Sequence, residues 1–169
     1  YKLYTLSTGS DYILYEYDIA TNTTQTVTNI GYSTSGDFTF YKGNLIFQTW
    51  SPNSIYMVKA YNPATGVLKD MLCFPQIFQL WGLTTQFDEC DNSVTFGSNP
   101  YQPMVSINFD TQVTTQLPTA FPVGQNFYGL ASTNEHLGSL CPPQNLPGLV
   151  CDPLATDSFN NAEASIYPN

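Results

Sequence analysis

Apolar and polar residues alternate along short stretches of the chain, and Gly, Pro, Asn and Asp interrupt each stretch. Because the side chains of a β-strand point alternately to its two faces, this pattern predicts short strands joined by tight turns. Aromatic residues make up 15% of the chain and charged residues 10%, and a composition rich in Tyr, Phe, Val and Thr also favours strands. The clearest stretch predicts four consecutive strands, at Asp37–Tyr41, Leu45–Thr49, Ile55–Tyr61 and Val67–Cys73.

Two signals recur along the chain at nearly the same spacing. The first is a glycine that enters an apolar strand, at Gly36, Gly82 and Gly129, with separations of 46 and 47 residues. The second is an Asp or Asn that begins a turn after an alternating strand, at Asp18, Asn62 and Asn108, with separations of 44 and 46 residues. Such a side chain accepts a backbone N–H two residues on, and the residue four positions later is expected to be left-handed. Together the two signals predict a repeat of roughly 45 residues.

Four antiparallel strands in a unit of about 45 residues are typical of a β-propeller blade. The chain begins with strands two to four of a unit, at Tyr1–Leu6, Tyr12–Ile19 and Thr24–Ile30, and has an isolated strand one at Phe127–Ser132. We therefore expect an all-β, propeller-like domain over residues 1–136, with about three blade equivalents. Closed propellers usually hold about four to eight blades, so further blades are expected before Tyr1 unless the units are arranged otherwise. The two incomplete ends also fit closure into one blade, and a β-sandwich is the alternative fold.

The charge of the chain excludes some classes of partner. Four Lys, no Arg and 13 acidic residues give a net charge of −9. Binding to nucleic acid or to an anionic membrane surface needs a basic patch, and too few cations are present to form one. No run of about 18 apolar residues predicts a membrane span. The chain opens at Tyr1 without a signal peptide, and we interpret it as a processed or truncated piece of a longer precursor.

From Leu137 the alternation ends, and residues 137–169 form a Pro-rich tail. Its last residues, SIYPN at Ser165–Asn169, follow an acidic, Ser- and Asn-rich linker and resemble the start of a type A C-terminal sorting domain of the type IX secretion system of Bacteroidota. The segments GDFTFYKGNLIF, YNPATG and FYGLASTNEH resemble propeller-like repeats of large secreted flavobacterial proteins. The resemblance implies export by the type IX secretion machinery, followed by release or attachment to the cell surface. It implies no single activity.

Four cysteines in a chain that resembles exported proteins predict two disulfides, with three possible connectivities. We favour Cys141–Cys151, because these two enclose nine residues of a tail that lacks a core of its own. Cys73–Cys90 would remain, but the predicted strands place these two far beyond the roughly 7 Å between Cα atoms that a disulfide allows. The alternative is that Cys73 is a buried thiol and that Cys90 pairs with the tail.

The densest acidic cluster contains Asp88, Glu89 and Asp91. Three carboxylates in a tight turn can bind Ca²⁺ through their oxygens, although the spacing does not match an EF-hand loop and a solvated hairpin turn explains the cluster equally well. His136 is the single histidine, and no glycine-elbow serine accompanies it. We interpret it as an ordinary turn residue rather than as a member of a catalytic triad.

A glycosidase needs paired carboxylates, and candidates are present at Asp18, Asp37, Asp70 and Asp110. All four lie at turns or strand edges, where a polar residue is expected for structural reasons. Asp37 is the strongest candidate for contact with a ligand, because it follows Gly36 at the start of an inner strand, near the central channel of a propeller. The structural interpretation is still favoured for it.

Aromatic residues near strand ends are a further set of candidates for contact with a ligand, at Trp50, Tyr56, Trp81 and Tyr101. Stacked rings commonly hold sugars, although most aromatic residues between sheets belong to the core. The sequence thus predicts a non-catalytic, exported repeat module that binds a surface glycan or protein, or serves an adhesive or structural role, without a cofactor other than the candidate Ca²⁺. The alternative is a fragment of a secreted hydrolase or lyase that acts on polysaccharide.

Overall fold

The computed structural model describes residues 2–7, 11–50, 55–74, 79–99, 102–118 and 129–151. This part of the chain is all-β, as predicted, and has one short 3-10 helix, η1 (Glu135–Leu140). None of its helices has the length and apolar character needed to cross a membrane. The strands are β1 (Lys2–Leu6), β2 (Ile13–Asp18), β3 (Thr23–Asn29), β4 (Ser33–Tyr41), β5 (Asn44–Trp50), β6 (Tyr56–Asn62), β7 (Val67–Phe74), β8 (Gly82–Glu89), β9 (Asn92–Asn99), β10 (Gln102–Asn108) and β11 (Val113–Gln116).

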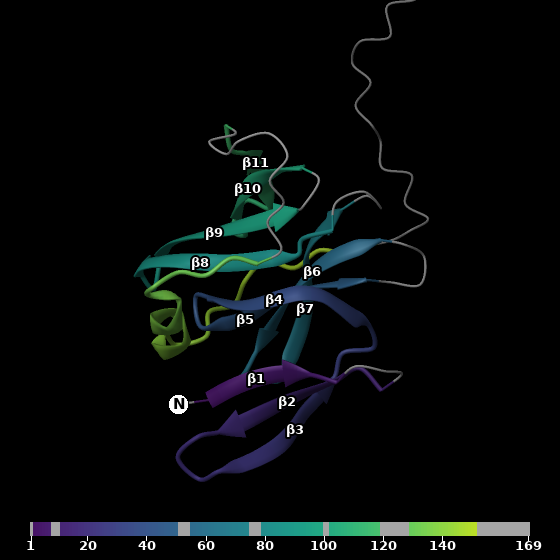
Figure 1. Cartoon of the computed structure of the whole chain (residues 1–169), viewed down its shortest axis with the longest axis vertical. Coiled ribbons are helices and arrows are strands. Elements are labelled where there is room, and N and C mark those ends of the chain that lie inside the picture. Colours follow the sequence, from purple (N-terminus) through teal and green to yellow (C-terminus); the bar gives the residue numbers. More distant parts are fainter. Residues whose placement is uncertain are drawn as a thin grey trace, which may run out of the picture.

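The strands form three antiparallel sheets, and in each sheet neighbours in sequence are neighbours in space. The first sheet contains β1 to β3, the middle sheet β4 to β7 and the third sheet β8 to β11, and none of them closes on itself. Figure 1 shows the three sheets stacked in chain order. The four strands predicted from the clearest stretch are β4 to β7, and the first sheet has the three strands predicted for an incomplete unit.

The predicted turns are confirmed in all three sheets. Asp18 accepts the N–H of Ala20, and the Oδ1 atoms of Asn62 and Asn108 each accept two backbone N–H groups of their own turns. The residue four positions later is left-handed each time, with φ values of 55°, 71° and 58° at Asn22, Gly66 and Gln112. The recurring turn therefore fixes where the last two strands of each sheet reverse.

The middle sheet is covered on both faces. Toward the first sheet, Leu45 and Phe47 of β5 pack with Leu14 of β2 in one buried cluster. Toward the third sheet, Ile46 of β5 packs with Ile107 of β10 in a second cluster. Neighbouring residues of β5 point to opposite faces, so one strand supplies both cores. Each core thus needs two sheets, because neither sheet buries its apolar face alone.

The segment that follows η1 crosses the ends of the middle and third sheets. Gln144 donates its backbone N–H to the Lys42 carbonyl, and Leu149 donates to the Asp70 carbonyl in an isolated antiparallel bridge. Leu146 is 4% exposed and lies in the core between the two sheets. Residues 141–151 are therefore a packed strap, which hereafter is called the strap.

The two predicted disulfides are present, but the favoured pairing was wrong. Cys73 pairs with Cys151 and Cys90 pairs with Cys141, and each pair of Cα atoms is 5.6 Å apart. Proximity in sequence suggested Cys141–Cys151, whereas the strap passes Cys90 in the β8–β9 turn at one end and Cys73 near the end of β7 at the other. The alternative that Cys90 pairs with the tail is confirmed, and Cys73 is not a free thiol.

The predicted strand one at Phe127–Ser132 is not a strand in its described part, residues 129–132. This segment lies beside β8 instead of pairing with β1. The two ends of the chain therefore do not combine into one sheet within the described residues. Residues 152–169, which include SIYPN, lie outside the part of the chain that the structure describes.

Candidate functional site

The three repeat glycines meet where β4, β8 and the segment after Gly129 come together. A Cβ atom on Gly36 would lie 2.5 Å from the carbonyl oxygen of Trp81. A Cβ atom on Gly82 would lie 2.7 Å from the carbonyl carbon of Gly129. Both distances are far below a normal contact, so the backbones approach too closely for any residue but glycine. The glycines that recur in the sequence thus lie where the backbones of β4, β8 and the segment after Gly129 approach one another.

Asp37 lies at the centre of this approach. Its Oδ2 atom accepts the backbone N–H of Leu83 at 3.4 Å and that of Leu130 at 3.2 Å. Leu83 and Leu130 are the residues that follow Gly82 and Gly129, so this one carboxylate joins the middle sheet, the third sheet and the segment after Gly129. The half-buried side chain therefore has a structural role, and this favours the structural interpretation over the ligand-binding one.

The other three candidate carboxylates also have partners within the fold. Asp18 accepts the N–H of Ala20 in its turn. Asp70 pairs with Lys59, whose side chain is buried. Asp110 pairs with Lys42 at 2.6 Å and accepts the Tyr41 hydroxyl at 3.2 Å, which joins the third sheet to the middle one. These contacts give Asp18, Asp70 and Asp110 structural roles and do not bring them together as a pair of catalytic carboxylates.

The acidic turn does not form a metal centre in the structure. Asp88 accepts a hydrogen bond from Asn92, and Asp91 accepts one from Gln144 of the strap. No three His, Cys, Asp or Glu side chains, Glu89 included, are arranged to hold a metal ion in the part of the chain that the structure describes. The hydrogen bonds of Asp88 and Asp91 are therefore those of a hairpin turn that contacts the strap.

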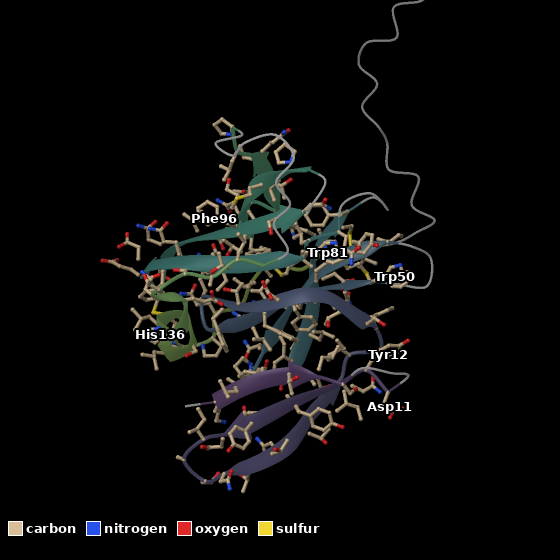
Figure 2. The ribbon with its side chains drawn as sticks, in the orientation of Figure 1. Asp11, Tyr12, Trp50, Trp81, Phe96 and His136 are labelled. Atoms are coloured by element: carbon tan, nitrogen blue, oxygen red, sulfur yellow. A yellow bond between two sulfur atoms is a disulfide. The ribbon has the colours of Figure 1, made fainter. Side chains whose placement is uncertain are left out.

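The aromatic candidates do not form one platform. Trp50 is 48% exposed and stacks on Tyr56, with ring centroids 6.5 Å apart. Trp81 is half-buried and donates its backbone N–H to the Ser98 carbonyl. Tyr101 lies outside the described residues. Figure 2 places Trp50 and Trp81 at the end of the sheets opposite His136.

A groove that the sequence did not predict lies between β1, β4 and η1. Its volume is about 1100 Å³, and the residues that line it are mostly apolar. Leu3 and Tyr4 of β1 form one wall, Phe38 and Phe40 of β4 form the floor, and Leu140 of η1 lies on the other side. The groove was missed because its walls come from elements that are more than 30 residues apart in sequence.

His136 and Glu135 add polar groups to this groove. His136 is exposed, as expected for a turn residue, and it lies in η1. Glu135 accepts the Thr84 hydroxyl of β8 at 2.5 Å, which holds η1 against the third sheet. The far wall of the groove is therefore fixed in place.

Behind the near wall, β2 carries a buried carboxylate that the sequence analysis overlooked and that contacts two lining residues of β1. Glu16 is 6% exposed, and it accepts hydrogen bonds from Tyr4, Lys2 and Gln25 at 2.7 to 2.8 Å. Burial by itself would raise the pKa of Glu16, but these three donors and the Lys2 charge outweigh it and lower that pKa. Aligning the turns of the three sheets would have singled out Glu16, because the uncharged Ala60 and Ser106 occupy its position in the other two sheets.

Burial, together with the charge of Glu16, raises the pKa of the Tyr4 hydroxyl well above its usual range. Tyr4 therefore remains a neutral hydrogen-bond donor in the near wall of the groove. The groove combines apolar surface with a few fixed polar groups, as ligand sites commonly do. Comparison of the chain with protein-family models, with curated proteins and with solved structures finds no match.

Proposed function

We propose that the chain is an exported, non-catalytic binding module, a propeller-like repeat of blades whose ligand site is the groove between β1, β4 and η1. The groove is the observation that carries the proposal. It offers Tyr4, Phe38 and Phe40 as apolar surface beside the polar groups of Glu135 and His136. Three stacked meanders with a common turn, two of which also open with a repeat glycine in the innermost strand, support the view of each sheet as a blade.

Export is supported by the two disulfides, because such bonds persist in oxidising surroundings outside the cytoplasm. The resemblance of the chain end to a sorting signal adds the type IX machinery as the partner during export. The test is to produce the full precursor in a host with this machinery and in a strain that lacks it. Peptide mapping of the protein from the medium without reductant should give Cys73–Cys151 and Cys90–Cys141, and cellular retention in both strains would contradict the proposal.

Binding is tested with two matched variants. Leu140 lines the groove and is 70% exposed, so Leu140→Asp places a charge in the groove at little cost to folding. Val150→Asp is the control, because Val150 is 86% exposed and does not line the groove. On glycan and peptide arrays, we expect a ligand whose affinity falls about tenfold or more with Leu140→Asp and is unchanged with Val150→Asp. A ligand that binds both variants as well as it binds the wild type would place the site elsewhere.

The alternative of a polysaccharide-active enzyme makes a different prediction. Its best candidate is Asp37, whose carboxylate joins β4 to β8 and to the segment after Gly129. Asp37→Asn keeps one oxygen acceptor, so this variant is expected to fold. We expect no release of reducing or unsaturated sugar ends by the wild type. Turnover by the wild type that Asp37→Asn abolishes without a change in melting temperature would establish the enzyme.

A further inference from the structure

A second cavity lies between the middle sheet and the strap. Its volume is about 360 Å³, and it is lined by residues of β6 and β7, by Asn44 at the start of β5 and by residues 143–146 of the strap. None of the described residues that line it is acidic, although the chain has 13 acidic residues and only four lysines. The volume is within the range of small-molecule sites, so the cavity is large enough for a ligand.

Lys69 of β7 gives this cavity a positive charge that no acid of the described residues neutralises. Each of the other three lysines pairs with an acidic side chain. The Lys69 ammonium donates instead to the Asn145 side-chain oxygen at 2.6 Å and to the Leu146 carbonyl at 3.0 Å. An ammonium has three N–H donors, so one donor is left for a ligand.

The amide side chains beside Lys69 also have donors left. Asn62 uses its Oδ1 atom to accept two backbone N–H groups of its own turn, and Asn145 uses its Oδ1 atom to accept Lys69. Within the described part of the chain, the Nδ2 groups of Asn62 and Asn145 donate to no partner. The cavity therefore combines a cation with neutral donors, and such a set of groups suits an anion.

The first sheet places a carboxylate of its own at the corresponding position. There Glu16 lies opposite Gln25, whose side-chain amide donates to it at 2.8 Å. At the same distances from the recurring turn, the middle sheet has Ala60 opposite Lys69. A methyl group thus replaces the acid and a cation replaces the amide. The middle sheet consequently has an open space beside Lys69 where the first sheet has a carboxylate.

We propose that this cavity binds a small organic acid that also carries hydroxyl groups. Its carboxylate accepts the remaining N–H of Lys69 and the amide groups of Asn62 and Asn145, in the position that Glu16 fills in the first sheet. Its hydroxyl oxygens can accept the donors that the carboxylate does not use. The site is separate from the groove between β1, β4 and η1, so the inference does not rest on the proposed function.

The probe is D-glucuronate, and D-glucose is its matched neutral control, because the two differ only in the carboxylate that replaces a CH₂OH group. Binding to the isotope-labelled full chain is followed by NMR titration. We expect saturable shifts of the amides in β6, β7 and the strap with glucuronate, and an affinity at least about tenfold lower for glucose. Equal affinities, or no saturable shift with glucuronate, would overturn the proposal.

Three variants locate the binding charge. Lys69→Gln is expected to weaken glucuronate binding about tenfold or more. Ala60→Glu keeps Lys69 but supplies the carboxylate that the first sheet has, so it should block the cavity from within. Val94→Glu is the control, because it lowers the net charge by one unit, as Lys69→Gln does, at a partly exposed residue that does not line the cavity.

Melting temperatures are compared in parallel, because Lys69 also holds the strap, and the variant that keeps the wild-type melting temperature decides the test. Unchanged glucuronate affinity in that variant would overturn the proposal. An equal loss of affinity in Val94→Glu would overturn it as well, because it would show an effect of net charge alone.

A last arm separates a free acid from the carboxylates of the chain itself. Asp152, Asp157 and Glu163 lie outside the described residues. The full-length variant Asp152→Asn, Asp157→Asn, Glu163→Gln neutralises all three, and we expect it to bind glucuronate as the wild type does. A clear gain in affinity would show that an acid of the chain already occupies the cavity, and it would overturn the proposal of a free ligand. None of these outcomes affects the groove, whose test is Leu140→Asp.

Discussion

The first and third sheets flank the same middle sheet, but they are attached to it in different ways. The third sheet is linked to the strap through Cys90–Cys141, and the strap is linked to the middle sheet through Cys73–Cys151. The first sheet contains no cysteine and is held by apolar contacts such as those of Leu14. The repeat thus gives the three sheets similar backbones, whereas the strap decides which two of them are cross-linked by disulfides.

The same comparison holds for the inner edge. In the two sheets that the strap links, the innermost strands are β4 and β8. The hydrogen bond from the Leu83 N–H of β8 to Asp37 of β4 holds these two strands together. In the first sheet the corresponding edge borders the groove. A ligand bound in the groove would therefore contact the sheet that neither disulfide restrains. This difference leads to four predictions, given from the largest expected effect to the smallest.

The largest effect is expected from removing a disulfide. Replacing Cys90 and Cys141 by Ser opens a loop closed over a sequence separation of 51 residues. Chain-entropy arguments give a loss of about 4 kcal/mol in the free energy of unfolding, and a similar loss is expected for the pair Cys73 and Cys151. Urea denaturation of both double variants measures this. A loss under about 1 kcal/mol would show that the strap is held by its hydrogen bonds and by Leu146.

Leu14→Ala is expected to release the first sheet preferentially. Leu14 is fully buried against the middle sheet, and such truncations cost about 2–5 kcal/mol. Because no disulfide restrains this sheet, hydrogen exchange should speed up in β1 to β3 more than in β4 to β11. Leu146→Ala is the matched control in the other core, where the exchange should change in the strap and its two sheets. Uniform acceleration in both variants would contradict the proposed difference between the sheets.

Gly82→Ala tests the close approach of the three units. The added Cβ would lie 2.5 Å from the Ser98 hydroxyl, which can rotate away, and 2.7 Å from the carbonyl carbon of Gly129, whose backbone must move, at a cost of about 1–3 kcal/mol. Gly129→Ala is the control, because among the described residues its Cβ would meet only the Asp37 carboxylate, at an ordinary 3.6 Å. Thermal unfolding should show a lower melting temperature for the first variant only. Equal melting temperatures would place the units further apart than the structure does.

The smallest effect is the pH dependence that Glu16 brings to the first sheet. The folded pKa of Glu16 lies below its ordinary value of 4.5, so its contribution to stability is present above about pH 4.5 and is lost as the pH falls through the folded pKa. The stability difference between wild type and Glu16→Gln should therefore narrow below pH 4.5. Urea denaturation between pH 7 and 3 measures it, with the exposed Glu89→Gln as the control. A difference that stays constant over this range would contradict the proposed hydrogen-bond network.

The alternation of residues and the two spaced signals determined the strands, their order and the turns at Asp18, Asn62 and Asn108. These features are local, since strand pairing between sequence neighbours and an Asx turn depend on residues a few positions apart. Only the tertiary structure decided the disulfide pairing, the approach at Asp37 and the groove. Each depends on segments that are distant in the chain: the strap that passes both sheets, the meeting of Gly36 with Trp81, and the placement of η1 opposite β1. The sequence predicts the individual sheets because each forms from neighbouring residues, whereas the contacts between sheets depend on how the sheets stack.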